Sequence, residues 1–112
     1  MAVDLPERLQ SALENADLDQ GQAARVLGTN PRTIARWLKE EATPRHATRE
    51  RVLELLAVLE RLSKVLRPQP AHDWLFGPNP SLDHHKPVDL LRGGHYREVL
   101  GAIDALGEGV FV

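Results

Sequence analysis

Asp19-Gln-Gly-Gln-Ala-Ala-Arg-Val-Leu-Gly-Thr-Asn-Pro-Arg-Thr-Ile-Ala-Arg-Trp-Leu38 is the stretch of this chain that decides its fold. It has the pattern of a helix-turn-helix, in which two short helices are joined by a tight turn. Ala24 is small where the second helix must cross closely, and Gly28 stands where the turn requires a positive φ. Ile34 and Trp37 supply the buried stripe of the second helix. The stretch therefore makes DNA the first partner to consider.

The outward face of this helix pair carries side chains that can read DNA. A short helix fits the major groove, where Arg can pair with guanine through two hydrogen bonds and Asn can pair with adenine in the same way. Basic side chains on the flanks contact phosphates instead. Because one small module offers limited contact area, useful affinity should require two copies. The candidates for base reading are Asn30, Arg32, Thr33 and Arg36, and those for phosphate contact are Arg25, Lys39 and Arg45.

The distribution of charge agrees with a nucleic-acid face. The whole chain has a net charge of -2, but residues 25–51 carry seven Lys or Arg against three Glu, a balance of +4 that leaves -6 for the rest. Such a separation suits DNA at one end and a different partner at the other. Glu40 and Glu41 close the second helix, where their negative charges oppose the helix dipole and repel DNA phosphates. DNA binding should therefore be salt-sensitive and weak for one subunit. Chance clustering on a solvated surface, or a helix pair that does not touch DNA, remain the alternatives.

The amino-acid composition favours a globular protein over a membrane or secreted one. A chain of 112 residues with 42% hydrophobic and 27% charged residues is typical of an ordinary globular protein. The longest apolar run, Leu55 to Leu59, is far shorter than the roughly 20 residues that span a bilayer, and the N-terminal segment lacks a signal-peptide core. A cytoplasmic location is therefore expected. The absence of cysteine excludes disulfides and thiolate metal sites.

Nothing in the sequence indicates an enzyme, a cofactor or a bound metal. There is no Gly-rich phosphate loop and no nucleophile motif, and the carboxylates are scattered over predicted helix surfaces. Adjacent histidines point apart on a helix, and no third ligand stands at a recognisable interval from them. The histidines considered were His72, His84, His85 and His95.

The periodicity predicts an all-α fold. Capping residues and helix-breaking Gly and Pro divide the chain into successive helices without a convincing strand. The predicted helices are Pro6 to Asn15, a second one from the cap Asp19 to Gly28, a third from the cap Asn30 onward, Arg49 to Leu66, Pro70 to Phe76, a short turn from Pro80, Pro87 to Arg92, and His95 to Leu106. Residues 107–112 are predicted as a tail.

The long helix Arg49 to Leu66 bears an apolar stripe that is too wide for one neighbour. The N-terminal helices can cover one side, and the C-terminal region or a second copy of the chain can cover the other. We expect residues 1–45 to form a DNA-binding domain and residues 46–112 to form a second domain, with the long helix as the spine. After Arg67 the chain changes to short helical turns rich in Pro and Gly.

The stretch Trp74-Leu-Phe-Gly-Pro-Asn-Pro-Ser-Leu-Asp-His-His-Lys-Pro-Val-Asp-Leu-Leu91, followed by Gly93 and a last helix with a short apolar tail, resembles the toxin-binding domain of the Xre/MbcA/ParS antitoxins. With the helix-turn-helix, the resemblance covers nearly the whole chain. It implies a type II antitoxin that neutralises a RES-domain toxin, an enzyme that destroys NAD, and that represses its own operon. It also implies antitoxin dimers that carry toxin subunits, with the antitoxin's C-terminal end closing the toxin's active-site entrance.

Carried onto this chain, the resemblance places the toxin-blocking plug in Gly109, Val110, Phe111 and Val112, supported by Gly94, His95, Tyr96 and Arg97. An apolar Val-Phe-Val segment is costly to leave in water and favours a pocket. A dinucleotide site offers a flat apolar slot for the phenyl ring and cations for a carboxylate. The tail could instead fold onto its own core or onto a dimer mate. For the chain as a whole, the alternative is a stand-alone dimeric helix-turn-helix transcription regulator.

Overall fold

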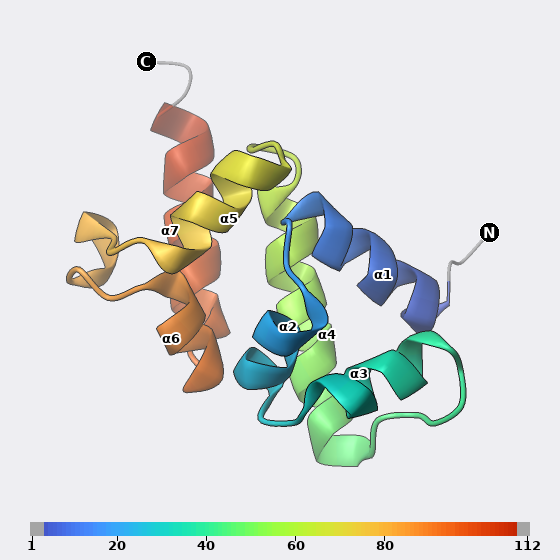
Figure 1. The fold of residues 1–112 in the computed structure, drawn as a ribbon. Helices are drawn as coiled ribbons and strands as arrows, with labels where there is room; N and C mark the ends of the chain where they lie inside the picture. The colour runs from blue at the N-terminus through green and yellow to red at the C-terminus, as the bar shows by residue number, and fades with distance from the viewer. Residues whose placement is uncertain (1–3, 110–112) are drawn as a thin grey trace.

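The computed structural model describes residues 4–109 and confirms an all-α fold, with no strand within that range (Figure 1). None of its helices is both long and apolar enough to cross a membrane. The elements are α1 (Leu5–Asn15), α2 (Gln20–Leu27), α3 (Pro31–Leu38), α4 (His46–Leu62), α5 (Pro68–Phe76), the 3-10 turn η1 (Pro80–Leu82), α6 (Pro87–Arg92) and α7 (Tyr96–Gly109).

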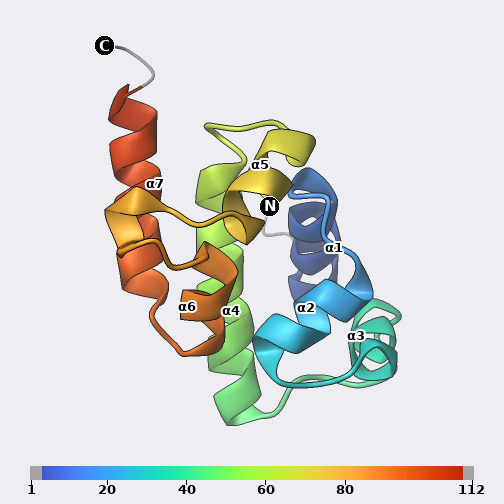
Figure 2. The ribbon, with the colours of Figure 1, turned by 60° about the vertical axis from the view of Figure 1, so that its left-hand side comes forward.

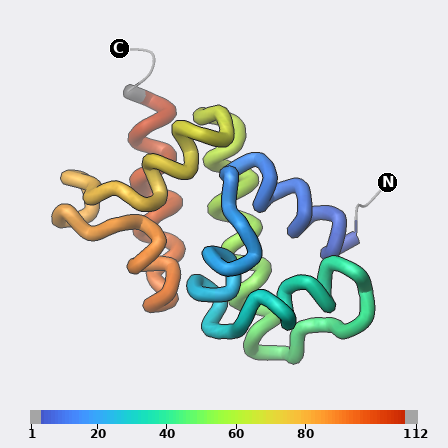
Figure 3. The backbone as a smooth tube through the Cα atoms, viewed as in Figure 1, coloured from blue at the N-terminus to red at the C-terminus, as the bar shows by residue number. Residues whose placement is uncertain are grey.

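The helix α4 runs through the middle of the molecule (Figures 1 and 2). α1 and α2 pack on one side of it and α7 packs on another, while α3 lies on α1 and α2. After α4 the chain turns sharply and α5 crosses back toward α6, which contacts both α2 and α7 (Figure 3). The apolar stripe of α4 was predicted to need neighbours on two sides. Helices α1 and α2 of the same chain cover one side, and α7 covers the other. Among the described residues, Leu53 is the large apolar side chain that is exposed to solvent, with 39% exposure.

The helix-turn-helix has the local structure that its sequence predicts. Asp19 and Gln22 form a reciprocal capping box, in which the side-chain oxygen of each residue accepts a hydrogen bond from the backbone N–H of the other. Gly28 ends α2 in the left-handed region, with φ 70°, where glycine carries no steric penalty. Pro31 occupies the first turn of α3, where its missing N–H costs nothing. Local signals therefore determine these two helices.

The bounds predicted for the long helix were wrong at both ends. α4 begins at His46, directly after the extended residue Arg45, because no helix breaker follows Pro44. It ends at Leu62 and not at Leu66. The hydroxyl of Ser63 donates to the Glu60 carbonyl oxygen at 2.8 Å, a local bond that competes with the helical ladder. The α region is also disfavoured immediately before Pro68.

Other bounds also differ from the prediction, and α1 starts at Leu5, one residue before the predicted Pro6. α5 starts at Pro68, two residues early, because two prolines fit within a first helical turn. α7 starts at Tyr96 and continues past Leu106 to Gly109, so residues 107–109, predicted as part of the tail, are helical. A Cβ atom placed on Gly107 would lie 3.6 Å from Val65, so the α4–α5 turn packs beside this part of α7. Residues 110–112 of the predicted plug lie outside the described residues.

One apolar core joins the two predicted domains. Buried side chains form a single cluster that extends from Leu9 in α1 to Ile103 in α7, and no polar side chain is buried among residues 4–109. The stripe of α4 lies at its centre, with exposures of 2% or less. The buried members of that stripe are Val52, Leu55, Leu56, Val58, Leu59 and Leu62.

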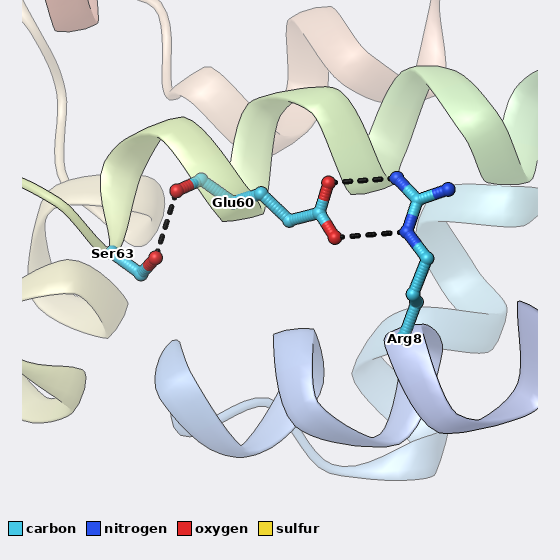
Figure 4. Close-up of polar contacts among 3 residues, drawn as sticks. All are labelled: Arg8, Glu60 and Ser63. Carbon is cyan, nitrogen blue, oxygen red and sulfur yellow. Dashed lines mark hydrogen bonds and ion pairs between the residues drawn. The ribbon is translucent and has the colours of Figure 1, made fainter. Parts of the chain in front are cut away.

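An ion pair ties α1 to α4 at the edge of this core (Figure 4). The guanidinium of Arg8 donates two hydrogen bonds to the Glu60 carboxylate, at 3.1 and 2.8 Å. These bonds are the main cause that lowers the pKa of Glu60; partial burial acts in the opposite direction, and the charge of Arg8 adds to the lowering. The side chains remain 37% and 42% exposed, so solvent screens their attraction.

Replacing Arg8 by Met is expected to lower the free energy of unfolding by about 0.5 kcal/mol at neutral pH. Because the folded state lowers the pKa of Glu60, the stabilisation is complete above the ordinary glutamate pKa and disappears as the pH falls through the lowered value. Urea unfolding of wild type and Arg8→Met between about pH 7 and pH 3 measures the difference. A difference that stayed constant down to the lowest pH would contradict an ionic origin.

Candidate functional site

α3 presents a basic face to solvent. Ile34 and Trp37 point into the core, with exposures of 0% and 6%. Arg32 and Arg36, four residues apart and therefore on one face, are exposed, as is Lys39 at the C-terminal cap. The structure thus separates the buried and outward residues of α3 as the sequence predicts. Two guanidinium groups lie one turn apart on a helix short enough for a DNA groove.

The side chains of Asn30 and Thr33 are hydrogen-bonded to each other at the N-terminal cap of α3, which limits how they can contact a ligand. The Asn30 side-chain oxygen accepts hydrogen bonds from the backbone N–H of Thr33 at 2.9 Å and from its hydroxyl at 3.1 Å. Pairing with adenine through two hydrogen bonds needs both the oxygen and the nitrogen of an asparagine amide. In this arrangement Asn30 can donate to a base or a phosphate, but full adenine reading would require it to give up the cap.

The flanking cations lie around the same end of the molecule. Arg25 is exposed in the last turn of α2, and Arg45 is exposed at the start of α4, whose first turn lies at the same end as α3 in both views (Figures 1 and 2). The two acidic residues do not close α3, contrary to the prediction. α3 ends at Leu38, and Glu40 turns the chain away with φ 62°. The carboxylates therefore follow the helix and are not part of its last turn.

The segment Gly94 to Arg97 joins α6 to α7 and is held by backbone hydrogen bonds. The Gly94 N–H donates to the Leu91 carbonyl oxygen at 3.1 Å, and the His95 N–H donates to that of Leu90 at 2.8 Å. Gly94 has φ 86°, which explains the glycine at this position. The guanidinium carbon of Arg97 lies 5.7 Å from the centroid of the half-buried Tyr96 ring. The result is an ordered, largely exposed corner.

The structure does not bring the two parts of the predicted toxin site together. The corner Gly94 to Arg97 lies at the start of α7, whereas Gly109 is the last residue of that helix (Figure 1). At 1.5 Å per residue the two parts are about 20 Å apart. A partner that contacts both must therefore lie along the length of α7.

Sequence reasoning missed the polar links that anchor the C-terminal part: besides Arg61, which donates to both carboxylate oxygens of Asp104 at 3.0 Å, there are two others. On α4, Arg51 donates from Nη2 to the carbonyl oxygens of Leu91 and Arg92, at 2.7 and 2.8 Å. On α2, the Gln22 amide nitrogen lies 3.1 Å from Nε2 of His72 in α5. No local signal could have shown either link, because the partners are at least 40 residues apart in sequence.

The histidines do not assemble a ligand set. His72 stacks on Phe76, with ring centroids 4.5 Å apart, and Nδ1 of His85 lies 2.9 Å from the Leu82 carbonyl oxygen. Within residues 4–109, no three His, Asp or Glu side chains are grouped as a metal site would require.

Comparisons with known proteins identify relatives of the same length. No family model matches the chain. It is 38% identical over 108 residues to the mycobacterial cidal antitoxin MbcA of Mycobacterium bovis and of Mycobacterium tuberculosis, covering 96% of both this chain and each relative. It is also 30% identical over 117 aligned positions to the probable mycobacterial cidal antitoxin Rv3188 of M. tuberculosis, covering 100% of both chains.

The fold agrees with these relatives. The structure matches a chain in the crystal structure of the M. tuberculosis MbcT-MbcA toxin-antitoxin complex with a TM-score of 0.86 and 37% identity, over 99% of this chain and 100% of that one. Similarity of this extent in both sequence and structure covers every helix described above. The chain therefore belongs to the family of the cidal antitoxin MbcA.

Proposed function

We propose that this chain is the antitoxin of a type II toxin–antitoxin system. The observation that carries the proposal is the near full-length similarity to MbcA, a protein crystallised in a toxin–antitoxin complex. Residues 46–112 would bind the toxin and a second antitoxin subunit, and residues 1–45 would bind DNA. The partner is a RES-domain toxin that degrades NAD, as the resemblance of the Trp74 to Leu91 stretch implies.

Neutralisation would occur by obstruction of the toxin's active site. The C-terminal segment Gly109 to Val112 enters the active-site entrance, while the corner Gly94 to Arg97 contacts the toxin surface beside it. Support comes from the apolar character of Val110 to Val112 and from the exposure of the corner. Because α7 separates these parts by about 20 Å, the toxin would lie along α7.

Autoregulation would use the basic face of α3. Exposed Arg32 and Arg36 are positioned to contact bases, and Arg25, Lys39 and Arg45 are positioned to contact phosphates. A dimer would place two such faces on half-sites roughly 34 Å apart or a multiple of it. The bound operator would be the promoter region of the antitoxin's own operon.

Co-expression with the protein encoded by the neighbouring gene tests the proposal. The expected result is a stable complex in which the neighbour's toxicity and its loss of cellular NAD are suppressed, and the mass of that complex gives the stoichiometry. A chain that bound its promoter as a dimer but neither bound nor neutralised the neighbour would instead be a stand-alone transcription regulator.

Substituting Arg32 or Arg36 by Ala is expected to weaken binding to the chain's own promoter by about tenfold or more each, since one bidentate base contact contributes about 1–3 kcal/mol. The measurement is a band-shift titration at fixed salt, with unrelated DNA of the same length as competitor. Arg67→Ala is the matched control, because Arg67 is exposed beyond the opposite end of α4. If all three variants bound alike, Arg32 and Arg36 would have no reading role.

A further inference from the structure

The corner Gly94 to Arg97 is fastened to α4 by one arginine. The Nη2 atom of Arg51 donates to the carbonyl oxygens of both Leu91 and Arg92, at 2.7 and 2.8 Å. These carbonyls lie in the last turn of α6: that of Leu91 also accepts from the Gly94 N–H at 3.1 Å, so Arg51 adds a further donor to it and supplies a donor to that of Arg92. A cation at this end also complements the helix dipole. Arg51 therefore closes the C-terminal end of α6 from a different helix.

The same guanidinium lies against the corner itself. A Cβ atom placed on Gly94 would be 3.3 Å from Nη1 of Arg51, so the backbone passes close to the arginine. Since Gly94 has φ 86°, both its conformation and its surroundings favour glycine. The position of the corner is thus defined by contact with Arg51 as well as by the turn geometry.

A carboxylate one turn along α4 completes the link. Nε of Arg51 lies 3.7 Å from Oε1 of Glu54, and the two side chains are only 33% and 30% exposed. The ion pair with Glu54 thereby holds the Arg51 side chain in place along α4 while its Nη atoms contact the end of α6 and the corner.

We propose that Arg51 is a positioning residue for partner recognition: it holds the corner Gly94 to Arg97 in the arrangement that the toxin binds. The inference rests on the proposed antitoxin function and adds a residue outside the predicted contact surface. The guanidinium suits this role because a single nitrogen carries two N–H groups, one for each carbonyl. Lysine also carries several N–H groups on one nitrogen, but it lacks the planar fork that directs Nε toward Glu54 while Nη2 meets both carbonyls, and methionine can donate to neither.

The test compares Arg51→Met, Arg51→Lys and Arg8→Met in the full chain, with the protein encoded by the neighbouring gene as the binding partner. Arg51→Met should bind at least tenfold more weakly, and Arg51→Lys should lie between it and the wild type. Arg8→Met removes another two-bond arginine link to α4, away from the corner, and should bind within twofold of the wild type. Equal affinity of Arg51→Met and wild type would overturn the proposal.

Amide hydrogen exchange in the free chain separates this inference from the proposed function. In Arg51→Met the amides of Gly94 and His95 should exchange at least tenfold faster, while the amides of α1 and α2 keep their rates. Unchanged exchange at the corner would refute the positioning role whether or not the toxin binds. A wild-type chain that failed to bind the neighbour would instead refute the antitoxin assignment.

Discussion

Removal of residues 110–112 is expected to leave the fold intact and to abolish neutralisation of the toxin. Among residues 4–109, the buried cluster that holds the chain together already includes Val99 and Ile103 of α7, so this helix is anchored before the removed segment begins. The segment Val-Phe-Val has the apolar surface that a nucleotide-binding slot would accept. Burial of each such side chain contributes about 1.5–3 kcal/mol. The three together are enough to change the affinity for the toxin by more than about a hundredfold.

The experiment pairs thermal unfolding of the truncated chain with growth and NAD measurements in cells that also express the neighbouring toxin. Phe111→Ala serves as the graded variant and should retain part of the protection. If the truncated chain still rescued the cells, the plug would be wrong. If it instead lost several degrees of thermal stability, the segment would be packing on its own core, the alternative that its composition leaves open.

The elements that could be predicted are those whose determinants lie within a few residues. Asp19 with Gln22, Gly28, and Asn30 with Pro31 define α2 and α3 through caps and turns, and the structure has all of these features. The C-terminal end of α4 is different. The apolar periodicity continues to Leu66, but the Ser63 hydroxyl bond and the turn before Pro68 end the helix four residues earlier.

The candidate site divides in the same way. Helical periodicity is sufficient to place Arg32 and Arg36 outside and Ile34 inside, because both sets follow from one helix. Periodicity could not show that the Asn30 oxygen is committed to Thr33, nor that α7 would separate the corner from Gly109. The contacts of Arg51 could not be predicted for another reason. Its acceptors are backbone carbonyls, which every residue has, so the pattern of side chains does not indicate them.

Replacing Leu56 by Ala should cost about 2–5 kcal/mol, because the side chain is fully buried in the middle of α4 and its loss leaves a cavity. A domain of this size has only about 5–15 kcal/mol of stability, so the variant should be partly unfolded at physiological temperature. α4 packs against α1 and α2 as well as α7. The substitution should therefore impair DNA binding and toxin binding together, unlike changes at Arg32 or Arg51.

Leu53→Ala is the matched control for this prediction. It makes the same chemical change on the same helix, one turn earlier, at a side chain that is 39% exposed. Its cost in urea unfolding should stay below about 1 kcal/mol, because less apolar surface returns to water and no enclosed cavity forms. Equal losses for the two variants would mean that Leu53 is also buried, and a second copy of the chain packed over that part of α4 would then be the physical explanation.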